Sequence, residues 1–234
     1  LKKAALFVFN GDPMHLYRHM LPDQILPLSL RLKRKSKLSM GLYVLFFGTD
    51  KQYPEVAHHT IWLGQRYKEL LSDIFDRKTL AEDFSLYVHR PTATDPSFAP
   101  AGKDSFYVLA PVPNQQGNVD WSVMEPKLRQ RIIHALDETM LPGLNESIRA
   151  EFAMTPDDFA QDYLSYQGAG FSIAPLFTQS AWFRFHNRSE AFDNLLLAGS
   201  GTHPGAGMPG VLSSAKVVEV LAAEYAAQFE GQPA

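Results

Sequence analysis

A glycine-rich stretch in the last sixth of the sequence has residue types that suit ligand binding. Five glycines and two prolines fall within the twelve residues from Gly199 to Gly210. Glycine lets the backbone approach a ligand and adopt positive φ at little cost. Pro209 suits the first turn of a helix, and the free N–H groups of such a turn would attract an anion or an electron-rich carbonyl. From the spacing alone, a tight connection between a strand and a helix that binds no ligand is as good an interpretation as a ligand-binding loop.

The elements that would position this stretch lie directly beside it. The apolar run 195–198 predicts a short buried strand, and the apolar periodicity from Val211 onward predicts a helix. No Gly-Lys-Ser/Thr ends the loop, so it is not a P-loop. Gly205, Gly207 and Gly210 have Gly-x-Gly-x-x-Gly spacing, but no βαβ unit follows them. The prediction is therefore a strand, a loop and a helix N-terminus.

The residues of this loop also carry a resemblance. Residues 199–216, GSGTHPGAGMPGVLSSAK, resemble the C-terminal flavin-binding signature of bacterial phytoene desaturases, the carotenoid-desaturating branch of the flavin amine-oxidase superfamily. Because that family carries its dinucleotide-binding βαβ unit in an N-terminal half that does not precede Leu1, the resemblance implies a C-terminal half. Further segments resemble the family in the same order and extend the resemblance over nearly the whole chain: 10–17, 57–60, 64–67, 81–87, 107–113 and 178–184.

The resemblance implies an FAD-dependent oxidoreductase of carotenoid biosynthesis that desaturates phytoene, a forty-carbon polyene. In that chemistry the flavin takes a hydride from an allylic C–H and a base or solvent accepts the proton. We expect a cytoplasmic protein, because no apolar run is long enough to span a membrane and no signal peptide is visible. The resemblance further implies peripheral association with membranes and a missing N-terminal half that is needed for activity and for firm FAD binding. The alternatives are a truncated, non-catalytic domain that binds substrate or a partner, and a related flavin-dependent polyene isomerase or oxidase.

The resemblance also assigns roles to residues. Arg66 is a candidate catalytic residue near the reacting bond, although a surface arginine at a helix start is an equal alternative. Aromatic residues are candidates for the wall of a polyene tunnel, with plain core packing as the alternative: Tyr166, Phe171, Trp182 and Phe183. The candidate FAD-binding residues are Gly199, Ser200, Gly201, Thr202, His203, Gly207, Met208, Pro209, Gly210 and Val211.

Composition excludes several other kinds of chemistry. The 234 residues include no cysteine, which removes disulfides, thiolate catalysis and cysteine-based metal sites. A net charge of −3 argues against a nucleic-acid partner. His58 and His59 are adjacent on an expected strand and should point to opposite faces, so we expect no metal site there. We expect the two histidines to be structural or surface residues, and the alternative is that one of them faces the substrate channel. The basic run 31–37 is a solvated surface or a contact with anionic lipid.

The periodicity predicts a mixed α+β or α/β fold. The resemblance implies that residues 1–20 are a strand and helix of the flavin domain, that residues 21–185 are a substrate-binding domain with a mixed sheet and helices, and that residues 186–234 are the C-terminal strand, glycine loop and helix of a Rossmann-like FAD domain. Residues 165–185 should be irregular. The expected strands are 4–9, 39–48, 58–64, 84–89, 106–112, 148–154 and 195–198, and the expected helices are 66–75 and 122–140, with others opening after Asp12, at Thr155 and near Pro209.

Overall fold

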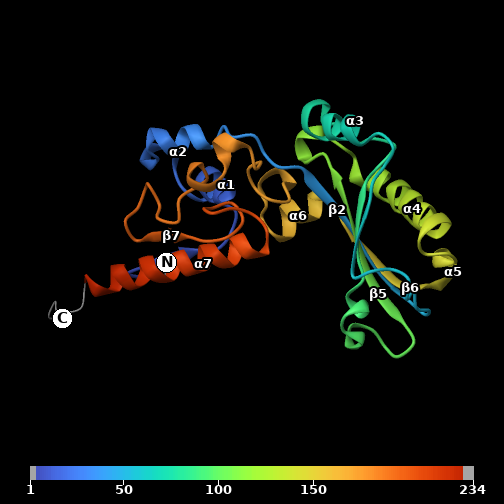
Figure 1. Ribbon diagram of the computed structural model, residues 1–234. Coiled ribbons are helices and arrows are strands. Elements are labelled where there is room, and N and C mark those ends of the chain that lie inside the picture. The colour runs from blue at the N-terminus through green and yellow to red at the C-terminus, as the bar shows by residue number, and fades with distance from the viewer. Residues whose placement is uncertain (1–3, 229–234) are drawn as a thin grey trace. The chain divides into compact units, whose positions relative to one another are not determined.

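The computed structural model describes residues 4–228. The chain divides into two compact units. The first combines Leu1–Ser39 with Ala160–Ala234, and the second is Met40–Phe159. Each is taken by itself below, with the element labels of Figure 1.

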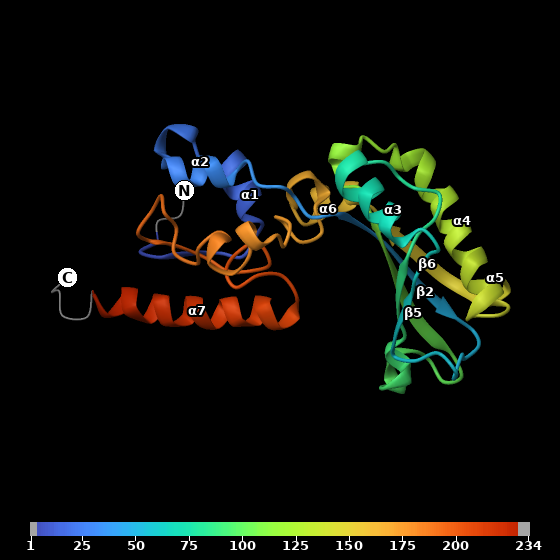
Figure 2. The ribbon, with the colours of Figure 1, turned by 45° about the horizontal axis from the view of Figure 1, so that its top comes forward.

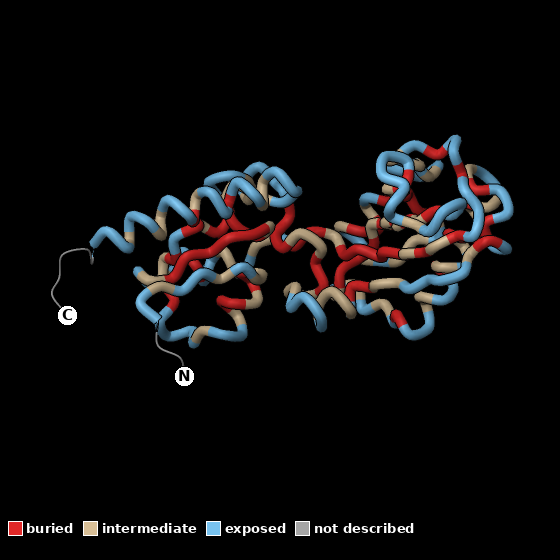
Figure 3. The backbone as a smooth tube through the Cα atoms, turned by 90° about the horizontal axis from the view of Figure 1, so that it is seen from below, coloured by how far each residue is buried: buried red, intermediate tan, exposed pale blue. Residues whose placement is uncertain are grey.

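The first unit contains a two-stranded parallel sheet. Strand β1 (Phe7–Phe9) pairs in register with β7 (Leu195–Leu197), and all three residues of β7 are buried. The helix α7 (Met208–Ala227) runs beside this sheet (Figure 1), while Figure 3 shows that most of α7 is exposed. The short helices α1 (Pro13–His15) and α2 (Leu28–Lys33) complete the regular structure of this unit apart from single turns.

The core of the first unit is assembled from segments that are far apart in the sequence. The ring of Tyr17 stacks on that of Phe185 with centroids 5.5 Å apart, and the Tyr17 hydroxyl pairs with Ser189 Oγ at 3.0 Å. Burial raises the pKa of Tyr17 to about 12. The other large buried side chains of this core are Met14, Leu16, Leu26, Leu30, Leu38, Ile173, Leu195 and Leu197.

The second unit is a five-stranded antiparallel sheet. Its strand order is β3-β4-β5-β2-β6, where β2 is Gly41–Thr49, β3 is His59–Trp62, β4 is Leu86–His89, β5 is Asp104–Val112 and β6 is Ile148–Met154. Helices α3 (Tyr67–Ser72), α4 (Trp121–Thr139) and α5 (Leu144–Ser147) all lie over the same face of this sheet (Figure 2). The chain passes back to the first unit through α6 (Pro156–Asp162).

Alternation along the strands decides which side chains meet the helices. In β5 every second residue from Asp104 to Val112 is buried, while the residues between them are half-exposed. Phe106, Val108 and Ala110 therefore pack in one core with Ile132 and Leu136 of α4. The intervening residues point to the opposite face of the sheet.

The predicted elements and fold class are confirmed, with shifts of a few residues at their ends. Asp12 caps α1, with Pro13 in its first turn and Asp12 Oδ1 accepting from Met14 N–H at 3.0 Å. Thr155 opens α6 with a reciprocal contact to Asp158. Between residues 165 and 185 the described helical structure consists of isolated 3₁₀ turns.

The division into three functional segments stays a prediction. In the structure residues 21–39 and 160–185, which we expected in the substrate-binding domain, belong to the first unit. None of the helices within residues 4–228 has the length and apolar character that crossing a membrane requires.

Candidate functional site

The glycine loop joins the end of β7 to the start of α7 within the first unit. Gly199, Gly205 and Gly207 have φ of +120°, +145° and +93°, a region that favours glycine. Gly207 is the N-cap residue of α7 and has no side chain to offer, and the first turn contains no acidic residue. Because the first N–H groups of a helix have no intrahelical acceptor, this terminus is a site for electron-rich oxygen.

The loop is fastened to both of its neighbours. Ser214 Oγ accepts from Gly199 N–H at 2.9 Å and donates to Val211 O at 2.6 Å, which ties the end of the strand to the helix. The hydroxyl of Thr202 donates to Gly199 O at 2.9 Å. The path of the backbone is therefore fixed by the chain itself.

Two loop glycines are required by packing. A Cβ on Gly201 would lie 2.5 Å from Cδ of Pro13, and a Cβ on Gly210 would lie 2.6 Å from the carbonyl oxygen of Gly205. Any larger residue at either position must displace backbone or a rigid ring.

A buried arginine supports the loop, and the sequence analysis assigned it no role. The Arg184 side chain donates to Ser200 O at 2.7 Å, to Phe171 O at 3.1 Å and to Ile173 O at 3.2 Å. Arg184 is only 1% exposed, and this burial lowers its pKa, although the charge of Asp12 acts in the opposite direction. One feature of the sequence does indicate that Arg184 is buried: it is the single charged residue in the otherwise apolar run Ala-Trp-Phe-Arg-Phe.

Asp12 organises the same region from the other side. Besides capping α1, its carboxylate accepts from Tyr166 N–H at 2.8 Å and from Ser172 Oγ at 2.7 Å. One short acidic side chain thus joins the first helix to the irregular segment 165–185.

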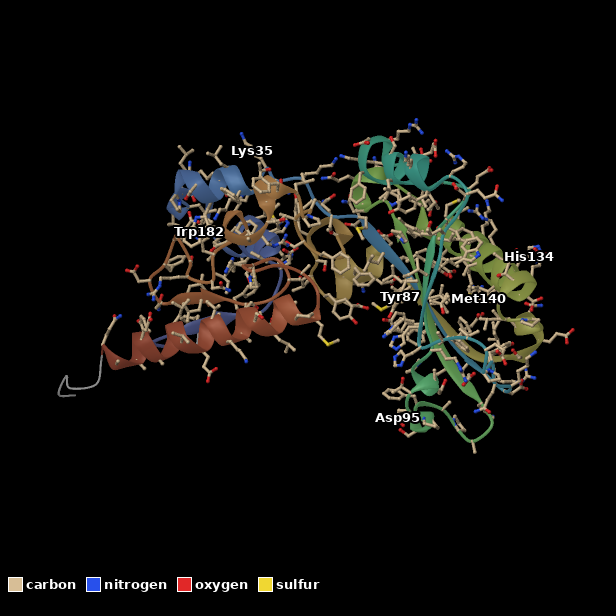
Figure 4. The ribbon with its side chains drawn as sticks, viewed as in Figure 1. Lys35, Tyr87, Asp95, His134, Met140 and Trp182 are labelled. Atoms are coloured by element: carbon tan, nitrogen blue, oxygen red, sulfur yellow. The ribbon has the colours of Figure 1, made fainter. Side chains whose placement is uncertain are left out.

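The candidate FAD-binding residues Gly199 to Val211 form one continuous loop and helix start. The four candidate tunnel aromatics also lie in the first unit. Trp182 (Figure 4) and Phe183 are 68% and 54% exposed, so they are not core residues of this unit. Tyr166 lies under the guanidinium of Arg18, 4.8 Å from the ring centroid.

Arg66 lies in the second unit, immediately before α3. Its guanidinium pairs with Asp83 at 3.1 Å and with Asp73 at 3.4 Å, and half of its side chain is exposed. These two carboxylates balance its charge. Its catalytic role stays a prediction.

The face of the second unit's sheet opposite α4 carries an aromatic row. Phe152, Phe46, Tyr107, His89 and His59 are successive register partners, one from each of the five strands. Phe46 stacks on Phe152 with centroids 4.5 Å apart, and Tyr107 meets His89 edge-on at 4.5 Å. A second row of register partners runs alongside and consists of Met154, Val44, Leu109, Tyr87 and Ile61.

The aromatic row borders a largely apolar cavity of about 590 Å³. No pattern in the sequence indicated this cavity. Burial, followed by the neighbouring Tyr87, raises the pKa of Tyr107 to about 12. The Tyr107 hydroxyl therefore stays protonated further into the alkaline range than that of a free tyrosine. The residues lining the cavity include Phe46, Phe98, Tyr107, Phe152, His58 and His89.

The prediction that His58 and His59 point to opposite faces is wrong. Strand β3 begins at His59, so the alternation of a strand does not govern His58. The two rings lie side by side with centroids 4.3 Å apart, and His58 Nε2 is 2.8 Å from Nε2 of His89. Burial, then the neighbouring His58 and His59, lowers the pKa of His89.

Comparison with known proteins confirms the resemblance. No family model matches the chain. It is 48% identical over 222 residues to the neurosporene-forming phytoene desaturase of Rhodobacter capsulatus, an alignment that covers 92% of this chain and 42% of the relative. It is 46% identical to the lycopene-forming phytoene desaturase of Pantoea ananas, covering 92% of this chain and 44% of the relative.

Solved structures with low sequence identity share the fold. A variant of putrescine oxidase superposes with a TM-score of 0.59 at 11% identity, over 96% of this chain and 43% of that chain. Cyclohexylamine oxidase from Brevibacterium oxydans gives a TM-score of 0.55 at 13% identity, over 94% of this chain and 43% of that chain. The chain therefore shares its fold with these oxidases and is related to the phytoene desaturases, although it spans less than half the length of those relatives.

Proposed function

We propose that this chain is the C-terminal part of an FAD-dependent phytoene desaturase. The observation that carries the proposal is the loop 199–211, which joins left-handed glycines to an uncapped helix start in a chain related to those enzymes. Phytoene as substrate, the missing N-terminal half as partner and peripheral association with membranes are all parts of this proposal.

The residues of the loop fit a flavin ring. A Cβ built at Gly207 would meet no atom of the chain within 4 Å, so this backbone is bare and accessible. Nδ1 of His203 is buried and has no hydrogen-bond partner among residues 4–228. Met208, 78% exposed, offers an apolar surface next to the helix start. Bare backbone, free N–H groups and a flexible apolar side chain match the polar edge and the flat face of a flavin.

A bound flavin would supply the hydride acceptor for oxidising an allylic C–H bond. The chain's own contribution is electrostatic and steric. The N-terminus of α7 would stabilise negative charge next to Gly210 and Val211. Arg184 and Ser214 would hold that terminus in place through Ser200 and Gly199. Residues 199–211 include no aspartate, glutamate, lysine or arginine, so orientation of the flavin would come mainly from the backbone.

The open face of the second unit's sheet is proposed as the polyene surface. Its two rows bring aromatic and aliphatic side chains together over five strands, beside the apolar cavity. A hydrocarbon offers few hydrogen-bonding groups, so recognition must come from shape and buried apolar area. Tyr166, Phe171, Trp182 and Phe183 are retained as further candidate contacts, and Arg66 as a candidate polar residue near the reacting bond.

A hybrid enzyme tests the proposal. The chain replaces the matching stretch of the Rhodobacter capsulatus relative, and the purified hybrid is incubated with FAD, an electron acceptor and phytoene in liposomes. We expect bound flavin and products whose absorption shifts to longer wavelength as conjugated double bonds are added. Phe46→Ala should reduce turnover, whereas Val123→Ala, on the exposed side of α4, should not.

Two results would contradict the proposal. A hybrid that retains FAD but leaves phytoene unchanged would remove the desaturase assignment. Products with the mass of phytoene and altered double-bond geometry would support the isomerase alternative. The isolated chain is expected to lose FAD on desalting, and stoichiometric retention would show that the loop suffices for binding.

A further inference from the structure

Three histidines of the second unit meet at one end of the sheet. His59 of β3 and His89 of β4 are register partners, and His58 directly precedes β3. One ring nitrogen of each lies within 4.8 Å of a ring nitrogen of the other two. Within residues 4–228 this is the only group of three or more histidine or acidic side chains with such spacing. We call it the histidine cluster.

Hydrogen bonds already orient two of the three rings. Nδ1 of His59 pairs with the Tyr87 hydroxyl at 2.7 Å, and Nδ1 of His58 pairs with Thr94 Oγ1. These contacts occupy Nδ1 of both rings, while Nε2 of His58 pairs with Nε2 of His89, a hydrogen bond that a bound ion would replace. Proteins use the same arrangement around bound metals, where the far nitrogen of each ligating imidazole is held by a hydrogen bond.

The separations are close to those of a metal site. Zn–N bonds of about 2.0–2.1 Å in a tetrahedral site place ligand nitrogens about 3.3 Å apart. The His58 and His89 nitrogens, at 2.8 Å, would need to open by about half an ångström. Since no pair exceeds 4.8 Å, the widest would need to close by at most about 1.5 Å. Torsion of the exposed His59 ring supplies a movement of that size.

We propose that the histidine cluster binds one divalent transition-metal ion, with Zn²⁺ the best match, through one ring nitrogen of each histidine. Three neutral imidazoles suit zinc, copper or nickel, and the absence of a carboxylate within the cluster disfavours calcium and magnesium. The fourth position is open to water, because His59 is exposed.

The position of the cluster suggests what the ion would do. β3 is a four-residue edge strand whose only neighbour in the sheet is β4. An ion shared by His58, His59 and His89 would clip this edge strand to β4 and, through Thr94, to the turn that follows. It would also close one end of the apolar cavity, which His58 and His89 line.

Zinc binding to the whole chain tests this proposal. Equilibrium dialysis against ZnCl₂ at neutral pH should give one ion per chain and a higher melting temperature. His58→Gln and His59→Gln should each weaken binding at least about tenfold, and Tyr87→Phe about tenfold through the lost hydrogen bond to His59. His134→Gln is the matched control, because His134 lies on the outward side of α4, 70% exposed, whereas Tyr87 lies on the sheet (Figure 4). Co²⁺ should give the intense visible bands of a four-coordinate ion.

The proposal is overturned by absence of zinc binding, or by equal zinc affinity in the unchanged chain and in a folded His58→Gln, His59→Gln, His89→Gln triple variant. It is likewise overturned if Co²⁺ shows only the weak spectrum of a six-coordinate ion. Circular dichroism confirms that each variant is folded. Tyr87→Phe removes no ligand, so it tests the site even if loss of a histidine unfolds the chain.

Discussion

Replacing Arg184 by methionine tests whether this side chain holds the glycine loop. Methionine preserves an unbranched apolar stem and removes the donors to the carbonyl oxygens of Phe171, Ile173 and Ser200. A buried carbonyl left without a partner costs about 1–3 kcal/mol. Only the bond to Ile173 O is buried and the other two are half-buried, so the full penalty applies to one carbonyl and a part of it to the others. The loss is offset because the guanidinium no longer has to be desolvated.

The expected net loss in the free energy of unfolding is about 2 kcal/mol, within the range for losing hydrogen bonds to a charged group. Urea unfolding followed by circular dichroism measures it. Hydrogen exchange locates it: amides of 195–203 should lose protection, while those of 104–112, in the other unit, should not. Because the chain has two units, the exchange data also show whether the transition is two-state.

Arg188→Met is the matched control. Arg188 is four residues away, is largely exposed and makes a single 3.3 Å contact with Glu224, so its loss should cost about 0.5 kcal/mol or less. If Arg184→Met costs no more than this control, or if 195–203 keeps its protection, the reasoning that Arg184 fastens the loop is wrong.

Three further predictions concern other parts of the chain. Gly201→Ala should lower the free energy of unfolding by about 1–3 kcal/mol, because the new Cβ overlaps the Pro13 ring. Gly48→Ala is the control and should cost less, because the nearest atom to a Cβ there is 4.0 Å away. Urea unfolding compares the two variants. Asp104→Asn should cost about 3–5 kcal/mol in the same assay, because it leaves the charge of Arg90 buried without its carboxylate. Folding stabilises the neutral form of a tyrosine whose pKa is raised, so its contribution to the free energy of unfolding is present below pH 10.0 and is lost as the pH rises above that value. In an ultraviolet titration these tyrosines should ionise at a higher pH than free tyrosine, and the melting temperature should fall above pH 10.0. They are Tyr17, Tyr43, Tyr53 and Tyr107.

Local patterns predicted the elements well because the forces that form them are local. The apolar run 106–112 predicted a strand, which the structure has as β5, and Pro209 after a glycine run predicted where α7 starts. The cap at Thr155 depends on a residue three positions away. In each case the decisive contacts span a few residues, so they are visible in the sequence.

The contacts that build the candidate sites are not local. Arg184 meets Ser200 and Phe171 across irregular backbone, and nothing in its spacing indicates those partners. The aromatic row depends on the register of four strand pairs, whereas alternation assigns only a face to each residue. His58 was misplaced because the alternation of a strand was extended one residue beyond the strand's end.

The five loop glycines differ in what a Cβ would meet: Gly201 and Gly210 have no space for one, Gly199 and Gly205 would bring it into ordinary contact at 3.4 and 3.5 Å, and Gly207 lies in open space. Gly201 and Gly210 are demanded by the chain's own packing, so their presence would be required without any ligand. Gly207 differs, because a Cβ there would meet nothing in the chain, although its φ of +93° still favours glycine. Among the glycines of the signature, Gly207 is therefore the position whose surroundings have room for a ligand. That room opens at the first free N–H groups of α7, which is where the proposed flavin needs them.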